Sequence, residues 1–249
     1  MIVLKTTGEL ARMKEACAIA AGALQAAGNA VHPGVSTYEI DRAAHSYITK
    51  HGAIPTFLGY NGFPAASCVS INDEVIHGIP SKHRIVHEGD LVSIDVGATF
   101  NGYVGDNAAT FAAGEVSPEA KRLSDTTRES LYVGIAAAVA GGRIGDIGHA
   151  IQSYCEDRGF SVVREYTGHG VGAKMHEDPS VPNFGTPGRG VRLLPGMTIA
   201  IEPMINCGSP AIRQLADGWT VKTKDGLLSA HFEHTIAITA DGPVILTKI

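Results

Sequence analysis

The sequence lacks the marks of several protein classes. Its four cysteines (Cys17, Cys68, Cys155 and Cys207) include no Cys-x-x-Cys pair, a pattern that fits a reducing cytosol better than a disulfide framework or a zinc knuckle. The N-terminus turns polar after four residues, and no apolar run is long enough to span a bilayer. We therefore expect a cytoplasmic protein without a membrane segment.

Positive charge is also scarce. The net charge is −5 and there is no basic run, which argues against a direct role in nucleic-acid binding. Otherwise the composition is that of an ordinary globular protein, with 44% hydrophobic and 18% charged residues. The 249 residues allow one large domain or two small ones. The eleven histidines are the one feature of the composition that points to a function.

Two pairs of helices are expected, on either side of a β-rich stretch. Residues 9–30 have helical composition, and Ser36 followed by Glu39 is a capping box that opens a second helix. Ser117 is expected to cap the third helix, and Asp146 to cap the fourth. The order of elements predicts an α/β (α+β) chain.

The two halves of the sequence match at a fixed offset of 107 residues. The matching positions are Gly34, Ile40, Ser46, Tyr47 and Gly52 against Gly141, Ile147, Ser153, Tyr154 and Gly159. Residues 88–95 and 195–202 keep the same offset, which places Asp95 against Glu202. We predict one catalytic domain, 1–249, built from two α/β halves (approximately 9–111 and 116–240) around a pseudo-twofold axis.

The stretch SIDVGATFNGYVGDNAATF predicts a hairpin that carries two acids. The Asn-Gly dipeptide at 101–102 favours a two-residue type I′ turn. That turn places Asp95 opposite Ala108 and Asp106 opposite Gly97, where the glycine leaves space beside the acid. The two acids are then diagonal neighbours on one face, roughly 7–8 Å apart at the backbone. Two half-buried carboxylates need either a proton or a cation.

The repeat favours a cation. Glu202 matches Asp95, and Glu233 lies in another alternating β pattern. Four acids related by approximate symmetry imply a shared charge of high valence. Since four acids are too many for one ion, two ions that share bridging carboxylates fit better.

Three histidines stand in loops from which they can reach such a site. His169 and His176 lie in the glycine-rich TGHGVGAKMHEDP, and His77 lies in a Gly/Pro-punctuated turn. Carboxylates with an imidazole suit Mn, Fe, Co or Zn. Each residue alone has a simpler explanation, such as an edge-strand acid or a surface histidine. The joint pattern favours a dinuclear metal centre.

These residues resemble the pita-bread metallopeptidases, and within them the type I methionine aminopeptidases. The resemblance runs from end to end in five blocks: SCVSINDEVIHGIP, LVSIDVGATFNGYVGDNAATF, TGHGVGAKMHEDPSVPNFG, GMTIAIEPMI and SAHFEHTIAIT. It implies the pita-bread fold, in which two α/β halves with an antiparallel sheet surround a dinuclear metal cleft.

The resemblance also implies a set of metal ligands. Asp106 and Glu233 match ligands that bridge two divalent ions, such as Co, Mn, Fe or Zn. Asp95 matches a ligand of one ion, and His169 with Glu202 the ligands of the other.

Further residues match positions that act on the substrate. Glu202 would be the general base, and His77 and His176 would contact the scissile amide. The implied methionine pocket is lined by Phe57, Tyr60, Phe63, Cys68, Met175 and Trp219. Asn72 and Ser229 match a monovalent-cation site. Met175, Phe57 and His231 depart from the usual family residues, which bears on pocket shape and on the surroundings of the ligands.

The implied function is metal-dependent removal of the N-terminal methionine from nascent proteins and peptides, with a small second residue preferred. The expected setting is a monomeric, bare catalytic domain that acts at the ribosome. One alternative is a proline-specific aminopeptidase or dipeptidase of the same fold. Others are a non-catalytic peptide-binding relative and a hydrolase with one metal or none, as in the creatinase relatives.

Overall fold

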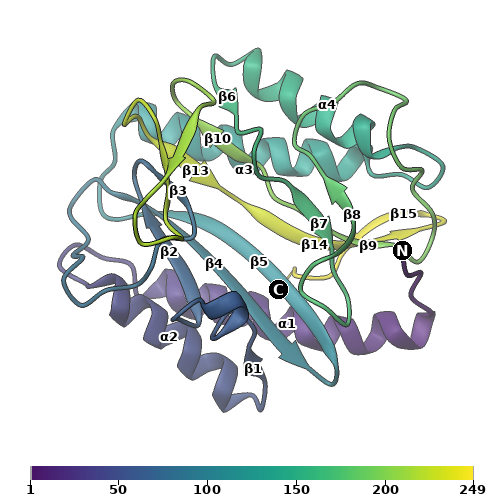
Figure 1. The fold of residues 1–249 in the computed structure, drawn as a ribbon, viewed down its shortest axis with the longest axis horizontal. Coiled ribbons are helices and arrows are strands. Elements are labelled where there is room, and N and C mark those ends of the chain that lie inside the picture. Colours follow the sequence, from purple (N-terminus) through teal and green to yellow (C-terminus); the bar gives the residue numbers. More distant parts are fainter. Residues whose placement is uncertain (1, 249) are drawn as a thin grey trace.

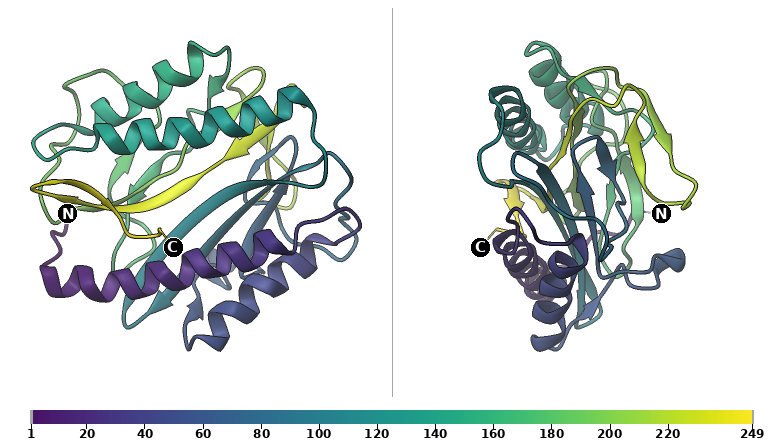
Figure 2. Two further views of the ribbon diagram at one scale, coloured as in Figure 1. Left: turned by 180° about the vertical axis from the view of Figure 1, so that it is seen from behind. Right: turned by 90° about the vertical axis from the view of Figure 1, so that its left-hand side faces the viewer.

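The computed structural model describes residues 2–248. Within that range all long helices lie on one side of a twisted sheet (Figures 1 and 2). They are α1 (Thr7–Asn29), α2 (Thr37–Lys50), α3 (Pro118–Ala137) and α4 (Ile144–Glu156). None of these described helices is both long and apolar enough to cross a membrane.

The main sheet is antiparallel throughout, in the order β1-β4-β5-β14-β9-β7-β8, with β2 also paired to β4 and β15 to β14. Its strands are β1 (Ile54–Pro55), β2 (Ser67–Ile71), β4 (Leu91–Phe100), β5 (Tyr103–Ala112), β7 (Gly168–Gly170), β8 (Glu177–Val181), β9 (Thr198–Ile201), β14 (Glu233–Thr239) and β15 (Gly242–Ile245).

Two small sheets and one short helix complete the fold. The first sheet joins β13 (Ser229–His231), β10 (Met204–Asn206) and β6 (Ser161–Val162). The second joins β11 (Ile212–Gln214), β12 (Val221–Thr223) and β3 (Glu74–Ile76). The 3₁₀ turn η1 (Tyr60–Gly62) follows β1.

Most helix starts agree with the sequence-based prediction, and one does not. The Ser36–Glu39 capping box is present, and Ser117 caps α3 by accepting a hydrogen bond from the Ala120 amide. The prediction that Asp146 is the N-cap of α4 is wrong, because that helix already begins at Ile144. Asp146 is its third residue, and its carboxylate accepts the amide hydrogen of Arg143 at 2.7 Å.

Backbone geometry repeats at the 107-residue offset. Gly34 and Gly141 have φ values of 93° and 89°, and Gly89 and Gly196 have 87° and 90°. Glycine adopts this left-handed region without the steric cost that a Cβ brings. Two isolated bridges match as well, Ser36 with Ile85 and Arg143 with Arg192. These correspondences support the proposal of two related halves.

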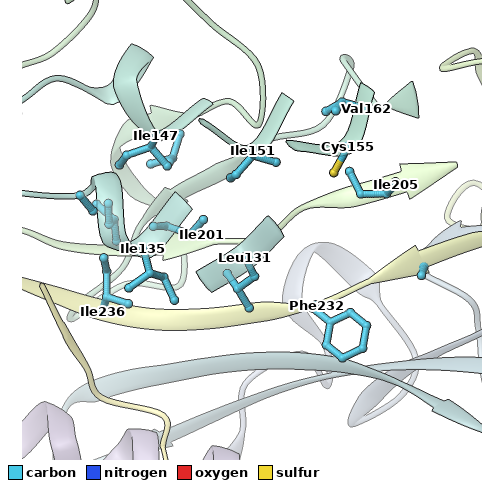
Figure 3. Packing of buried hydrophobic residues seen from close by; sticks show 14 of the residues in the cluster. Leu131, Ile135, Ile147, Ile151, Cys155, Val162, Ile201, Ile205, Phe232 and Ile236 are labelled. Carbon is cyan, nitrogen blue, oxygen red and sulfur yellow. The ribbon is translucent and has the colours of Figure 1, made fainter. Parts of the chain in front are cut away.

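Each pair of helices packs on its own core. Helices α1 and α2 cover β2 and β4, whereas α3 and α4 cover β9 and β14. In the second core Ile201 and Phe232, which directly precede two of the predicted ligands, are buried with Leu131 and Ile151 (Figure 3). Because side chains alternate along a strand, this anchoring directs the following acid to the opposite face.

Candidate active site

A cavity of about 280 Å³ is lined by residues of β4, β5, β7 and β14 and of the loops around them. All the residues predicted to be metal ligands or to contact the substrate line it: Phe57, Tyr60, Phe63, Cys68, His77, Asp95, Asp106, His169, Met175, His176, Glu202, Trp219 and Glu233. They come from segments that are far apart in the sequence, so the fold assembles the site.

The predicted hairpin register is confirmed, and it places the acids on one face. Asp95 lies opposite Ala108 and Asp106 opposite Gly97. On its other side Ala108 pairs with Glu233 in the neighbouring strand. Directly paired residues share a face of the sheet, so these three carboxylates point to the same side.

The ligand atoms converge on one point. Atoms of Asp106, His169 and Glu233 lie within 4.8 Å of one another. His169 Nε2 is 3.4 Å from Asp106 Oδ2 and 3.6 Å from Glu202 Oε1. Asp106, Glu202 and Glu233 therefore surround a single imidazole, and Asp95 lies close enough to Asp106 and Glu202 for their charges to act on it.

A second contact of His169 sets which of its nitrogens can bind a metal. Its Nδ1 lies 2.8 Å from the Gly170 carbonyl oxygen. A carbonyl only accepts hydrogen bonds, so Nδ1 carries a hydrogen and Nε2, which faces the acids, is the nitrogen that can give up its proton to bind a metal. Burial lowers the pKa of His169, but the Asp106 hydrogen bond and the Glu202 charge outweigh it and raise that pKa to about 9.

The acid cluster is electrostatically incomplete without a cation. Burial, followed by the charges of Asp106 and Glu202, raises the pKa of Asp95 and of Glu233 well above their usual ranges. In the described structure, Asp95 Oδ1, Asp106 Oδ1 and Glu233 Oε1 are buried without a hydrogen-bond partner. Buried oxygens without partners are costly unless a cation or proton satisfies them. This donor set fits a divalent metal.

The two other predicted histidines lie at the mouth of the cleft. His176 Nδ1 is 2.8 Å from the Tyr60 hydroxyl. His77 has a φ of 59° and packs edge-on against Tyr166 and Trp219. Burial lowers the pKa of His77 to about 4 and also lowers that of His176, so both rings are neutral at neutral pH.

The rest of the cavity wall is apolar. Phe63 and Trp219 meet edge to face with ring centroids 5.0 Å apart, and Met175 is buried in the same cluster. The space beside Gly97 is used by Phe57, because a Cβ at Gly97 would lie 2.6 Å from that ring. The prediction that this glycine makes room for Asp106 is therefore corrected: it makes room for the pocket wall.

Four residues that line the cavity were not predicted: Asn61, Ile76, Tyr166 and Thr167. Tyr166 and Thr167 stand just before Gly168-His169, and Ile76 stands just before His77, so adjacency to a predicted residue was an available signal. Asn61 lies in the tight turn of η1, and nothing in its local sequence marked it.

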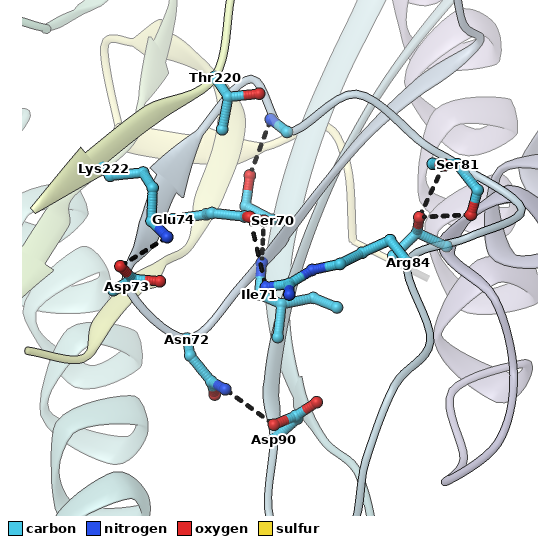
Figure 4. A network of polar contacts seen from close by, with 12 residues as sticks. Ser70, Ile71, Asn72, Asp73, Glu74, Ser81, Arg84, Asp90, Thr220 and Lys222 are labelled. Atoms are coloured by element: carbon cyan, nitrogen blue, oxygen red, sulfur yellow. Dashed lines mark hydrogen bonds and ion pairs between the residues drawn. The ribbon is translucent and has the colours of Figure 1, made fainter. Parts of the chain in front are cut away.

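The pair predicted for a monovalent cation also comes together. The Ser229 amide donates to the Asn72 carbonyl oxygen at 2.9 Å. The Asn72 side chain donates to Asp90 at 2.7 Å (Figure 4) and accepts from the Leu91 amide. Asn72 and Ser229 are thus neighbours, although Asp90 and Leu91 engage both polar ends of the asparagine side chain.

His231 lies beneath Glu202. Its Nε2 is 3.6 Å from Glu202 Oε2 and, among the described residues, has no hydrogen-bond partner. Asn183 donates a hydrogen bond to the Glu202 carbonyl oxygen at 2.9 Å. The buried His231 side chain therefore lies beside the Glu202 carboxylate, and the buried Asn183 side chain is bonded to the Glu202 main chain.

The similarity of this chain to known proteins agrees with a metal-dependent peptidase site. The family model described as metallopeptidase family M24 matches residues 11–240. The chain belongs to this family. The methionine aminopeptidase of Clostridium acetobutylicum is 53% identical over 99% of each chain.

Solved structures agree. The methionine aminopeptidase of Thermotoga maritima superimposes with a TM-score of 0.98, at 46% identity and with both chains fully covered. The Xaa-Pro dipeptidase of Bacillus anthracis gives 0.80 at 25% identity, over 99% of this chain and 62% of that one. The predicted pita-bread fold and the resemblance to type I methionine aminopeptidases are confirmed, and the chain is a metal-dependent hydrolase by family.

Proposed function

We propose that this chain is a methionine aminopeptidase that removes the N-terminal methionine from peptides and nascent polypeptides, with a small second residue preferred. The observation that carries the proposal is that four acids and His169 line the same cavity as a set of apolar side chains. The full-length relatives named methionine aminopeptidase support it.

The metal site is proposed to hold two divalent ions, of Co, Mn, Fe or Zn. Asp106 and Glu233 would bridge them, Asp95 would hold one, and His169 with Glu202 the other. The unpartnered buried oxygens of three of these acids support this assignment. When bound, the ions supply Lewis acidity that lowers the pKa of an attacking water. Asn72 and Ser229 are proposed to bind one monovalent cation nearby.

Three side chains carry out the proton transfers and the orientation. Glu202 takes a proton from the attacking water and delivers it to the departing amine. His176 donates a hydrogen bond to the oxygen of the scissile peptide bond as negative charge develops there. His77 orients the amide nitrogen of the second residue.

Selection for methionine comes from the apolar wall. A single methylene in such a slot is worth only about 1–3 kcal/mol. The length of the pocket and its contacts with sulfur must therefore act together. Phe57, Phe63, Cys68, Met175 and Trp219 supply those contacts, with Tyr60 at the mouth.

Proline-specific cleavage is the main alternative, since the Xaa-Pro dipeptidase shares the fold. A tripeptide panel that varies the first two residues separates the two. We expect cleavage of Met-Ala-Ser and no cleavage of Ala-Pro-Ser. The reverse preference would exclude the proposal, and binding of both peptides without cleavage would favour a peptide-binding relative.

Metal dependence is tested separately. Dialysis against a chelator should abolish cleavage of Met-Ala-Ser, and adding back Mn, Fe, Co or Zn should restore it. An enzyme indifferent to chelation would exclude the metal site and favour a metal-free hydrolase.

We further propose that residues 1–249 act as one monomeric catalytic domain in the cytoplasm, at the ribosome. The four cysteines are all free thiols, which supports a reducing compartment. Light scattering tests the monomer, and co-sedimentation with ribosomes tests the site of action.

A further inference from the structure

Two neighbouring histidines in the cleft have different kinds of partner at the same ring atom. The rings of His169 and His176 lie 4.3 Å apart, centroid to centroid. His169 Nδ1 faces the Gly170 carbonyl oxygen, which can only accept a hydrogen bond. His176 Nδ1 instead faces the Tyr60 hydroxyl at 2.8 Å, which can donate one.

The partner at Nδ1 determines what Nε2 can do. In a neutral imidazole one nitrogen carries the hydrogen and the other a lone pair. With its hydrogen on Nδ1, His169 can bind a metal only through Nε2, whose lone pair is free once the ring has lost its second proton. If Tyr60 donates to His176, that ring presents an N–H at Nε2, as a donor to a peptide oxygen must.

The charges around the cleft favour this second arrangement. Nδ1 of His176 is engaged by Tyr60, so Nε2 is the nitrogen left for contacts inside the cavity that Asp106 and Glu202 line. A lone pair directed at carboxylates is repelled, whereas an N–H is attracted. A free lone pair there would also compete with His169 for metal.

The loop that carries Tyr60 is built to hold it. Gly59, Asn61 and Gly62 have φ values of 83°, 49° and 88°. The Gly59 amide donates to the Phe63 carbonyl oxygen at 2.8 Å, and the Phe63 amide donates to the Tyr60 carbonyl oxygen at 2.9 Å. These two backbone hydrogen bonds restrain the turn, and the restrained turn holds the Tyr60 hydroxyl beside His176.

We propose that Tyr60 is a positioning residue that holds His176 in the tautomer with the hydrogen on Nε2. In this role the contact of the Tyr60 hydroxyl with His176 matters more than the packing of the Tyr60 ring in the pocket wall. The inference rests on the proposed function only in the use made of the Nε2 hydrogen, which is to bind the oxygen of the scissile peptide bond.

The direct test is ¹⁵N NMR of the histidine rings in the metal-free and the zinc-loaded protein, with His176 assigned from the His176→Asn spectrum. We expect wild-type His176 to show protonated Nε2 and unprotonated Nδ1. Tyr60→Phe keeps the ring and removes the hydroxyl, so both tautomers should then be populated. A hydrogen on Nδ1 in the wild type, or no change in Tyr60→Phe, would overturn the proposal.

Kinetics give a second readout. Tyr60→Phe should lower kcat for Met-Ala-Ser about three- to tenfold, the worth of one neutral hydrogen bond, with KM nearly unchanged because the ring remains. A rise in KM at unchanged kcat would mean that Tyr60 only lines the pocket, against the proposal.

The chain offers a matched control on the other side of the sheet. The Tyr132 hydroxyl lies 3.4 Å from His234 Nε2, so Tyr132→Phe removes a second tyrosine–histidine contact outside the cleft. It should leave the His176 signals and kcat unchanged. The NMR result does not depend on turnover, so failure of the peptide panel with the expected tautomer would reject the proposed function alone.

Discussion

The two halves of the molecule deliver equivalent acids by different routes. In the first half Asp95 and Asp106 come from one continuous hairpin, β4–β5, with a two-residue turn. In the second half Glu202 follows β9 and Glu233 begins β14, and four short strands, β10–β13, lie between them.

The surroundings of the acids differ as well. Asp95, Asp106 and Glu233 each keep a buried oxygen without a partner among the described residues. Glu202 has His169 and His231 each within 3.6 Å and is 13% exposed at its side chain. Glu202 therefore has two imidazoles beside its carboxylate, whereas its equivalent Asp95 has a buried oxygen without a partner. Equivalent acids in different surroundings are suited to different tasks, cation binding at Asp95 and proton transfer at Glu202.

The largest effect is expected when the charge of either of the two equivalent acids, Glu202 or Asp95, is removed. Glu202→Gln should lower kcat about 10²–10⁴-fold, the range for a general base, in a folded protein. Asp95→Asn should instead weaken metal binding, so that added metal partly restores activity. Turnover of Met-Ala-Ser and metal content by mass spectrometry check both. Normal turnover by Glu202→Gln would show that Glu202 is not the general base and that the two equivalent acids do not differ in role.

The pH dependence of the metal-free protein tests one acid from each half. The folded-state pKa values of Asp95 and Glu233 lie well above the ordinary 3.8 and 4.5. The folded state therefore binds their protons more tightly, and the stability they contribute below about pH 4 is lost as pH rises. Each group can lower the free energy of unfolding by about 1.4 kcal/mol per pH unit.

Urea unfolding of chelated protein between about pH 5 and about pH 8 measures this loss. Asp95→Asn and Glu233→Gln should each flatten the profile relative to wild type, because each variant removes one titrating acid, and Asp95→Asn also removes a charge that raises the pKa of Glu233. Added metal should raise the stability at high pH. A profile that is the same in all three proteins would show that these acids titrate normally.

A smaller effect is expected at Gly97, where the first half forms the pocket wall. Gly97→Ala would place a Cβ 2.6 Å from the Phe57 ring, and overpacking of this kind costs about 1–3 kcal/mol. We expect KM for methionine peptides to rise at least about fivefold. Phe57→Leu in the same chain should relieve the clash, and a KM that stays high in the double variant would contradict this account.

The smallest effect compares the equivalent helices α2 and α4. The Ser36 side chain caps α2, whereas α4 has no side-chain cap at Arg143. Ser36→Ala should lower the free energy of unfolding by about 1 kcal/mol, and Arg143→Ala by less than about 0.5 kcal/mol. Thermal and urea denaturation check both, and equal losses would mean that the caps are equivalent.

What could be predicted from the sequence was local. An Asn-Gly turn fixes the register of a hairpin through adjacent residues, so the positions of Asp95 and Asp106 followed from pairing rules. The Ser36–Glu39 capping box spans one helical turn, and it too was correct. The ligand cluster was reached because the repeat transfers the hairpin geometry to Glu202.

What could not be predicted depends on contacts between distant segments. Asn61 lines the cavity because the fold brings η1 to it, and no local pattern marks that residue. Asp146 was misplaced because Arg143, a poor capping residue, is the N-cap of α4, which puts Asp146 at the third helical position. The use of Gly97 depends on Phe57, forty residues earlier in the chain.

The β4–β5 hairpin also has a consequence for the order of synthesis. The pairings between its two strands are made within residues 91–112, and such local contacts form quickly. During translation Asp95 and Asp106 can therefore be brought together long before Glu202 and Glu233 leave the ribosome. Pulse-labelled hydrogen exchange on ribosome-bound chains ending after residue 115 would follow this step. We expect the early hairpin to keep its acids protonated or solvated until the second half arrives.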